Sequence, residues 1–342
     1  MMSLFRSWPS TLARCAGIAA LGLAAAGPAS AADLKPLTVV LPYVPNMESF
    51  AGFYAKDKGF FEEAGLDVKL IPGGQGIDQI QMVASGIAQI GMADASSAMA
   101  AIDKGAPLMI IAAEYQTSPQ AMTCRKDSGI TEPSMLKGKK LAIKQNAQVV
   151  ADFFLAKNNL SRSDMETTAI GTSDIAQIIA GKVDCMFTTF AFNEPYLIEQ
   201  AGVPVNVMPV GDWGMPSQND VWVVTKDFLA DPENKTLLAA YMTGEMKAWD
   251  FYIDNPEKAA EFMVNGGFND GLNIEQQTYQ ATHQIAYMTS PLTKEKGLLW
   301  IDFDVWKEAV KNAQTAELTS SVLDPSTFLT TEILEMVKPT KH

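Results

Sequence analysis

Residues 37–105 read LTVVLPYVPNMESFAGFYAKDKGFFEEAGLDVKLIPGGQGIDQIQMVASGIAQIGMADASSAMAAIDKG, and this stretch decides the fold. Two short apolar runs, 37–41 and 66–71, have the length and composition of strands. Between them, residues 46–58 carry aromatic side chains at helical spacing until Gly59 ends the helix. A strand followed by a helix and a second strand is the unit of a parallel sheet.

The same alternation continues along the rest of the chain. Further apolar runs occur at 88–92, 108–113, 140–144, 183–188 and 221–225, and helical patterns separate them. This order predicts an α/β protein with parallel sheets and crossover helices. Beyond Asp227 the pattern is almost wholly helical, with 237–252 the clearest amphipathic run, and we expect these helices to buttress the first domain.

The first 31 residues have the pattern of a secretory signal peptide. Arg6 and Arg14 precede an apolar run, and Ala29-Ser30-Ala31 supplies small residues for cleavage. The apolar run is too short to span a membrane, which takes roughly 20 residues. The sequence therefore predicts export and a mature chain of 311 residues.

Length and charge limit the possible functions. A chain of this length favours two domains, each able to bury a core. Without Arg6 and Arg14 the mature chain has 24 basic and 39 acidic side chains, a net charge of −15. Nucleic acids and anionic membrane surfaces are poor partners for so acidic a protein.

Two cysteines, Cys124 and Cys185, remain in the predicted mature chain. In an oxidising compartment they could pair, but both lie in apolar, strand-like segments where buried free thiols are common. We expect them to be unpaired, because nothing in the sequence brings them together.

Three phrases in the first half of the chain are typical of one family. KDKGFFEEAGLDVKL, SGIAQIGMAD and KGAPLMIIA resemble the solute-binding proteins of ABC importers in the nitrate/taurine and thiamine-precursor (NMT1/THI5-like) group. The resemblance covers nearly the whole mature chain. It implies a type II periplasmic binding protein, with two Rossmann-like lobes joined by two hinge strands. It also implies a periplasmic monomer that serves an inner-membrane ABC permease and its cytoplasmic ATPase.

The family pattern indicates where the chain passes between the lobes. Residues 118–125 and 220–226 look extended and fit two crossing strands. On this interpretation residues 32–119 and 226–342 form the first lobe, and residues 120–225 form the second.

Ligand sites in open parallel sheets lie beyond the carboxyl ends of the strands, so the loops there supply the candidates. In the first lobe, Tyr43, Phe50 and Tyr115 offer aromatic surfaces, and Asn46 and Glu114 offer polar groups. Phe50 also fits the core stripe of a helix. Backbone N–H groups at Gly74 could bind a carbonyl or an anion at a helix start, and Asp94 could cap the next helix while Ser96 faces the cleft.

In the second lobe, Gln145 and Asn146 follow a strand and precede a helix. The phrase FTTFAFNEPY places Phe190, Asn193 and Glu194 together at another strand end. Similar acidic-aromatic phrases occur in family members that bind aminopyrimidines, although Glu194 would also suit an ordinary helix start. Trp213 lies beside the second crossing, as a cleft wall or as core.

The scarcity of arginine bears on the ligand. The mature chain has only Arg125 and Arg162, and neither falls at a strand end that would face the cleft. Arginine is the favoured partner of sulfonate, carboxylate and nitrate. Carboxylates and aromatic rings instead favour a planar heteroaromatic ligand with N–H donors, with a thiamine-precursor pyrimidine first. Riboflavin, sulfonates such as taurine, and nitrate remain alternatives.

Catalysis is the competing class of function, because the resemblance extends to fungal pyrimidine synthases. Those enzymes carry a CCCFC motif and an active-site histidine, and this chain lacks the motif. Its histidines are His283, in a helical pattern of the tail, and His342, the last residue. Metal-ligand spacings, nucleophile elbows and phosphate loops are not found in the sequence, so it predicts a binding protein without metal or cofactor.

Overall fold

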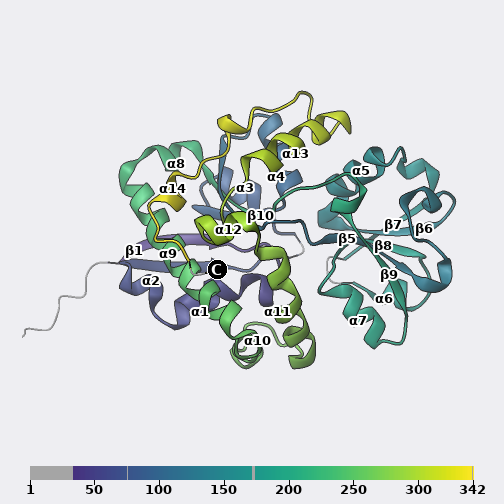
Figure 1. The fold of residues 1–342 in the computed structure, drawn as a ribbon, viewed down its shortest axis with the longest axis horizontal. Coiled ribbons are helices and arrows are strands. Elements are labelled where there is room, and N and C mark those ends of the chain that lie inside the picture. Colours follow the sequence, from purple (N-terminus) through teal and green to yellow (C-terminus); the bar gives the residue numbers. More distant parts are fainter. Residues whose placement is uncertain (1–33, 75, 172–173, 341) are drawn as a thin grey trace, which may run out of the picture. The chain divides into compact units, whose positions relative to one another are not determined.

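A computed structural model describes residues 34–342, apart from residues 75, 172–173 and 341 and the side chain of residue 146. The predicted signal peptide, 1–31, lies outside the described residues. Within residues 34–342 the chain forms two five-stranded sheets, each covered by helices (Figure 1). This confirms the α/β class predicted from the alternation of apolar runs and helical patterns.

The first sheet has the strand order β2-β1-β3-β10-β4. Its strands are β1 Lys35–Val40, β2 Leu66–Ile71, β3 Ile90–Ala93, β4 Leu108–Tyr115 and β10 Asn219–Thr225. Strands β1, β2 and β3 are parallel, whereas β10 runs antiparallel to both of its neighbours, β3 and β4.

The second sheet has the order β7-β6-β8-β5-β9. Its strands are β5 Gln120–Arg125, β6 Lys140–Lys144, β7 Glu166–Ile170, β8 Cys185–Phe190 and β9 Val205–Pro209. Here β6, β7 and β8 are parallel, and β5 runs antiparallel to β8 and β9.

Both sheets are therefore mixed, and the expectation of parallel sheets is wrong for β5 and β10. The reason is topological: β5 and β10 each enter a sheet directly from the other one, without a crossover helix that would return them in the parallel direction. These are the two hinge strands of the predicted fold class. The range predicted for the second lobe, 120–225, includes β10, which its hydrogen bonds place in the first sheet.

Helices cover both sheets (Figure 1). Between the strands lie α1 Phe50–Asp57, α2 Phe60–Glu63, α3 Gln79–Ala84, α4 Ala95–Asp103, α5 Gln148–Lys157, α6 Ala176–Ile179 and α7 Glu194–Gln200. The tail contains α8 Lys226–Ala230, α9 Pro232–Asp254, α10 Pro256–Asn265, α11 Ile274–Met288, α12 Pro291–Lys296, α13 Phe303–Thr315 and α14 Glu332–Glu335. Short 3-10 turns include η1 Met47–Ser49, η4 Gln145–Ala147 and η6 Val210–Trp213. Tail helix α9 packs on α1, so part of the tail does buttress the first sheet.

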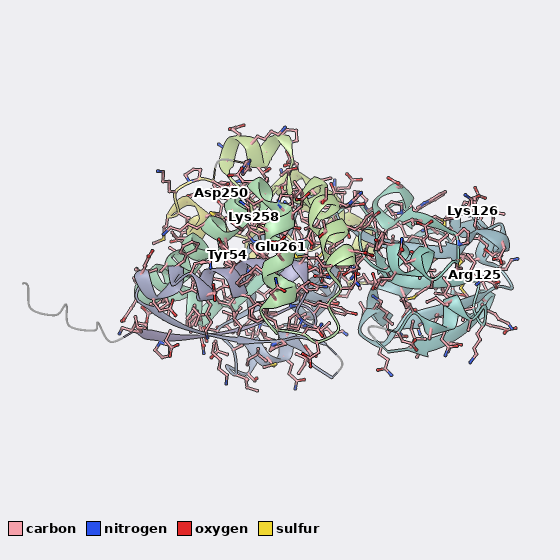
Figure 2. The ribbon with its side chains drawn as sticks, turned by 90° about the horizontal axis from the view of Figure 1, so that it is seen from below. Tyr54, Arg125, Lys126, Asp250, Lys258 and Glu261 are labelled. Atoms are coloured by element: carbon pink, nitrogen blue, oxygen red, sulfur yellow. A yellow bond between two sulfur atoms is a disulfide. The ribbon has the colours of Figure 1, made fainter. Side chains whose placement is uncertain are left out.

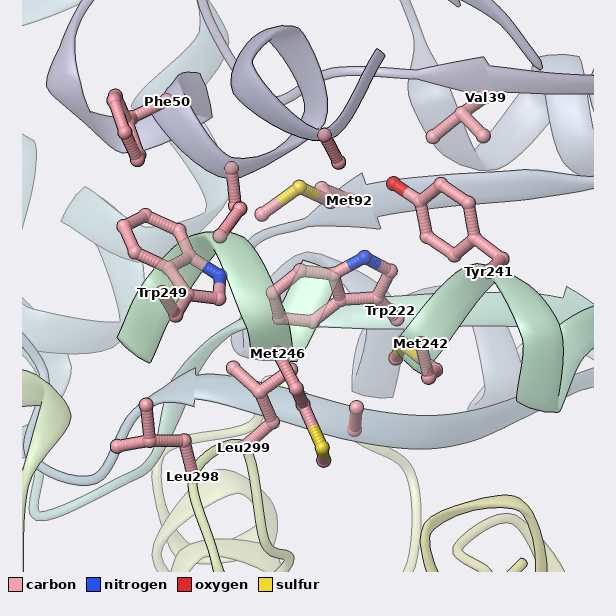
Figure 3. Close-up of a cluster of buried hydrophobic side chains, with 14 of the residues drawn as sticks. Val39, Phe50, Met92, Trp222, Tyr241, Met242, Met246, Trp249, Leu298 and Leu299 are labelled. Carbon is pink, nitrogen blue, oxygen red and sulfur yellow. The ribbon is translucent and has the colours of Figure 1, made fainter. Parts of the chain in front are cut away.

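An aromatic cluster in this interface corrects one predicted site residue. Phe50 is fully buried, and its ring lies 5.3 Å from that of Tyr252 and 6.2 Å from that of Trp249. Figure 3 shows Phe50 beside Trp249 on the core side of α1, with Trp222 of β10 in the same cluster. Phe50 begins the apolar stripe of helix α1. This stripe packs into the core because burying an aromatic ring is strongly favourable.

The two cysteines form a disulfide, which overturns the expectation that they are unpaired. Cys124 of β5 lies directly opposite Cys185 of β8 in the antiparallel register, and the two sulfurs are bonded. The antiparallel pairing of β5 with β8 brings the two cysteines together, and no local pattern in the sequence predicts this pairing.

Candidate functional site

A cavity of about 430 Å³ lies where strand ends of the two sheets meet. Both sheets contribute side chains, and several of them follow or end a strand, as expected for an open α/β sheet. The lining residues are Pro42, Tyr43, Glu48, Ile77, Asp78, Gln79, Ile80, Met92, Ala93, Asp94, Ser97, Ala100, Ala101, Lys104, Gln120, Lys144, Ala147, Val149, Val150, Thr188, Phe190, Asn193, Glu194 and Asp220.

Asp94 connects the two sheets across the cavity. It follows β3 and caps α4, where its Oδ1 accepts from the Ser97 backbone N–H at 2.9 Å. Its Oδ2 accepts from Nε2 of Gln120, the first residue of β5, at 2.8 Å. Burial raises the pKa of Asp94, and these hydrogen bonds partly offset the effect by stabilising the carboxylate.

A buried ion pair forms the opposite wall. Lys144 ends β6 and Glu194 begins α7, and each side chain is only 6% exposed. The Lys144 ammonium contacts Oε1 of Glu194, while Oε2 accepts from the Phe190 backbone N–H at 2.8 Å. Both oxygens of Glu194 are thus engaged, and the loop that carries Phe190 is fixed by this carboxylate.

Asn193 is held by a tail helix that the sequence did not connect with the site. Its Oδ1 accepts from Nε2 of Gln276 in α11 at 2.7 Å, and both side chains are buried. Two further buried glutamines of α11, Gln280 and Gln284, donate to Glu48 and Glu114 at 3.5 and 3.3 Å. Helix α11 therefore presents a row of amides to polar groups in and behind the cavity.

Glu48 is a buried acid in the loop that follows β1. It lies in the 3-10 turn η1, is 4% exposed, and accepts from Asn46 Nδ2 at 3.0 Å. Burial raises the pKa of Glu48 to about 7, with Asn46 opposing that rise and Glu194 adding to it by charge repulsion.

Asp220 is a further buried acid and lies in the hinge strand β10. The side chain is 3% exposed, and its Oδ2 has no hydrogen-bond partner among the described residues. Its backbone has φ of +45°, a left-handed conformation that costs free energy for a residue with a Cβ. Burial raises the pKa of Asp220 well above its ordinary value, and the charges of Glu48 and Asp94 raise it further.

Two aromatic rings complete the lining. Tyr43 follows β1, and the Lys144 ammonium lies 5.7 Å from the centre of its ring. Phe190 ends β8 and packs edge-on against Tyr115 and Phe192, with ring centres 6.0 and 5.6 Å apart. A planar ligand can stack on such rings while the neighbouring carboxylates and amides fix its orientation.

The sequence of this chain matches a known protein family. The sequence model of a family described as NMT1/THI5 like matches residues 46–259. The chain belongs to the NMT1/THI5-like family.

Individual relatives of this NMT1/THI5-like protein are distant in sequence but match over most of their length. The riboflavin-binding protein RibY of Chloroflexus aurantiacus is 24% identical and aligns over 92% of this chain and 91% of its own. The formylaminopyrimidine-binding protein of Halalkalibacterium halodurans is 21% identical, over 85% and 91%. Fungal 4-amino-5-hydroxymethyl-2-methylpyrimidine phosphate synthases also match, at 24% identity for one from Saccharomyces cerevisiae.

Solved structures agree with the fold. The periplasmic aliphatic sulphonate binding protein SsuA from Escherichia coli superposes with a TM-score of 0.65 at 15% identity. The match covers 90% of this chain and 94% of the other. At this identity the likeness shows the fold alone, which is that of a periplasmic binding protein.

Five of the predicted site residues of this NMT1/THI5-like chain line the cavity: Tyr43, Asp94, Phe190, Asn193 and Glu194. Asn46 lies just behind the lining and binds Glu48. Gln145 is exposed in η4, and the side chain of Asn146 lies outside the described residues.

Other predicted residues lie away from the lining. Glu114 and Tyr115 are fully buried behind it, and the carboxylate of Glu114 accepts from Gln284. Trp213 packs on the core of the second sheet, and its carbonyl oxygen accepts from Asn158. Ser96 is buried within α4, so that the next residue, Ser97, lines the cavity instead.

The glycine pair has a packing role, and the helix start predicted there lies further along the chain. Helix α3 begins only at Gln79, with Asp78 as its cap, so Gly74 does not open a helix. A Cβ on Gly73 would lie 2.5 Å from the Leu41 carbonyl oxygen, and Gly74 has φ of +126°. Glycine is needed here because the loop passes directly against the end of β1.

Glu48, Gln120 and Asp220 line the cavity but were not among the predicted residues. Gln120 and Asp220 begin strands that enter from the other sheet, so a rule based on carboxyl ends overlooks them. For Glu48 a usable signal existed: it follows Asn46 by two residues, within the loop already singled out.

Neither arginine of the predicted mature chain lines the cavity. Arg125 ends β5 at the opposite end from Gln120, and Figure 2 labels it beside Lys126 in the part of the chain that contains the second sheet. Its guanidinium binds Asp127 at 2.7 Å. Arg162 binds Asp152 and Gln148. Both guanidinium groups therefore have local structural partners.

The raised pKa of Glu48 leads to a pH prediction with a matched control. The folded pKa is about 7 against an ordinary 4.5, so the folded state holds a proton that the unfolded state has lost in this range. Stability therefore falls as pH rises from about 4.5 to 7, by up to about 3 kcal/mol for this group. Glu48→Gln removes the titrating carboxyl group and should remove that loss. The free energy of unfolding of the variant minus that of wild type should therefore be larger at pH 8 than at pH 5.

Glu245 of α9 is the control for this measurement. It is buried, accepts from the Tyr241 hydroxyl at 2.6 Å, and burial raises its pKa to about 7 as well. Glu245→Gln should change the pH dependence in the same direction, although it does not line the cavity. Urea denaturation of both variants at pH 5 and 8 tests this, and identical pH profiles for wild type and variants would contradict it.

Proposed function

We propose that this protein is the solute-binding component of an ABC importer, and that it binds a small planar nitrogen heterocycle in the cavity. The observation that carries the proposal is the lining itself, where Tyr43 and Phe190 offer ring faces beside the carboxylates of Glu48, Asp94 and Asp220. An ionised carboxylate accepts hydrogen bonds but cannot donate them, so it selects ligands with N–H donors.

The distribution of charge favours a heterocycle over an anion. Five carboxylates line the cavity against two lysines, Lys104 and Lys144. Lys144 is already bound to Glu194, and Lys104 is exposed at the rim. Among the described residues no unpaired buried lysine or arginine is present to neutralise a sulfonate or nitrate, and burying an uncompensated charge is unfavourable in a low-dielectric site.

Two of the relatives bear names that agree with this class, since riboflavin and formylaminopyrimidine are both planar nitrogen heterocycles. We favour a pyrimidine of the thiamine-precursor type as the ligand, with riboflavin as the second candidate. The volume of about 430 Å³ lies within the range of small-molecule sites, roughly 300–1,000 Å³.

Transport would use the two-lobed fold. The ligand contacts side chains of both sheets, so its binding free energy favours the closed arrangement in which both sets of contacts exist. The predicted signal peptide would deliver the protein to the periplasm, where an inner-membrane permease recognises the closed form.

Two other functions use the same site and are separable by experiment. The match to fungal synthases raises catalysis, which turnover of a bound pyrimidine by the purified protein would reveal. A sensor subunit that reports ligand occupancy to a membrane kinase is the second. A gene for a histidine kinase beside this one would favour sensing, whereas permease and ATPase genes would favour import.

A thermal-shift screen tests the proposed ligand class. Ligand-stripped protein is heated with aminopyrimidines, flavins, aliphatic sulfonates, nitrate and bicarbonate, because a bound ligand raises the apparent stability by mass action. We expect a rise in Tm with a pyrimidine or a flavin. A rise with sulfonates or nitrate alone would contradict the proposal.

A variant links the shift to the cavity. Tyr43→Ala removes a ring face and should weaken binding about tenfold, corresponding to about 1.4 kcal/mol. Tyr279→Ala is the control, because Tyr279 is a half-buried tyrosine of α11 that does not line the cavity. Equal losses in the two variants would show that Tyr43 has no specific role.

A further inference from the structure

Two buried acids of the cavity, Glu48 and Asp220, pair with no basic side chain among the described residues. In the described part of the chain neither forms an ion pair with a lysine or an arginine, and Lys144 is bound to Glu194. They come from different elements, η1 and β10, yet both line the same cavity and are at least 96% buried. We call these two residues the acid pair.

The strand geometry holds Asp220 in place without satisfying its carboxylate. The residues on either side of it pair in the first sheet, Asn219 with Tyr115 and Val221 with Ala93 and Ala113. The Asn219 side chain is fixed as well, since its Oδ1 accepts from the Ala95 N–H at 2.9 Å. Oδ2 of Asp220 nevertheless lacks a hydrogen-bond partner among the described residues, although buried polar groups are ordinarily paired.

The charged surroundings of the acid pair are dominated by other acids. Asp94 and Glu114 lie close enough to interact with Asp220, and Tyr115 lies in the same network. Glu194 and Lys144 act on Glu48 in opposite directions, since one repels and the other attracts its charge. Burial is nevertheless the largest influence on the pKa of Glu48 and of Asp220, and it favours the protonated form of each carboxyl group.

We propose that the acid pair binds a cationic nitrogen group of the ligand, and that binding releases protons from the pair. This inference rests on the proposed function, because it assigns a charge and an orientation to the heterocycle. A cation beside two buried carboxylates favours their ionised forms, so protons leave as the ligand enters. By linkage, the affinity for a cation rises with pH from about 5 to 8.

A pair of probes of the same shape tests the charge. 4-Aminoquinoline is a cation throughout this pH range and has N–H donors, whereas 4-methylquinoline is essentially neutral at pH 8 and lacks donors. Titration calorimetry at pH 8 should show at least tenfold tighter binding of 4-aminoquinoline. Its affinity should fall at least tenfold between pH 8 and pH 5, and at about pH 6 buffers of different ionisation enthalpy should report about one proton released per ligand.

Isosteric variants assign the effect to the acid pair. Glu48→Gln and Asp220→Asn should each reduce the preference for 4-aminoquinoline to less than threefold and flatten the pH dependence. Glu245→Gln should retain both, because Glu245 has the same burial but lies outside the cavity. Circular dichroism establishes that each variant is folded, and the proton count of the wild type tests the proposal even where a variant fails to fold.

The outcomes separate this inference from the proposed function. Equal binding of the two quinolines, or binding without proton release, would overturn the inference while leaving a heterocycle-binding protein. If no heterocycle of the thermal-shift screen binds, the proposed function fails as well. Retention of the preference in both isosteric variants would also overturn the role of the acid pair.

Discussion

Lys144→Met is expected to lower the free energy of unfolding by about 3 to 5 kcal/mol, because it leaves the Glu194 carboxylate buried without its cation. Both side chains are 6% exposed, so solvent cannot replace the lost ammonium group. The loss is measured by urea denaturation at pH 7.

The double variant Lys144→Met/Glu194→Gln provides the internal control. Replacing both partners of a buried pair is often nearly neutral, so the double variant should recover most of the stability lost in Lys144→Met. Lys307 of α13 gives a comparison on the surface: it pairs with Asp304, and the two side chains are 63% and 88% exposed. Lys307→Met should cost far less than Lys144→Met, because solvent screens an exposed pair. A similar cost at Lys144 would mean that water reaches the Lys144–Glu194 pair freely.

The parts of the fold that were predictable from sequence are those fixed by local pattern. Strands β2 and β6 begin and end at the predicted residues, 66–71 and 140–144, because turn-forming residues and apolar runs define them locally. The direction of β5 and β10 was not predictable in this way. An antiparallel strand and a parallel strand have similar residue patterns, and only the passage of the chain between the sheets decides between them.

The site residues also divide into those that a local sequence pattern predicts and those that it does not. Tyr43, Asp94 and Phe190 follow or end parallel strands, so the rule of carboxyl strand ends found them. Phe50 was misassigned because an aromatic residue near a strand end can also begin the core stripe of a helix, and burial against Trp249 decided the outcome. Gln276 reaches the cavity region from a helix about 80 residues further along the chain, and no local pattern connects it with Asn193.

Loss of the disulfide is the second large effect that we expect. Cys124 and Cys185 are separated by 61 residues, a segment that includes β6 and β7 of the second sheet and helix α5. Restricting a loop of this length in the unfolded chain is worth about 4 kcal/mol in the chain-entropy description. Reduction should therefore lower the free energy of unfolding by about this amount, measured by guanidinium denaturation of the oxidised and the reduced protein.

The design of this experiment follows from the burial of the two sulfurs. Both cysteines are 0% exposed, so the bond must be reduced in the unfolded protein, which is then refolded under reductant. Comparing oxidised with reduced wild type keeps both sulfur atoms in the core and isolates the cross-link, whereas Cys124→Ala/Cys185→Ala adds the cost of lost packing. The alanine variant should be insensitive to reductant.

Because neither cysteine lines the cavity, ligand affinity under folding conditions should change less than about twofold. A large loss of affinity with little loss of stability would mean that the cross-link positions the cavity wall through β8, which carries Phe190, instead of restricting the unfolded chain.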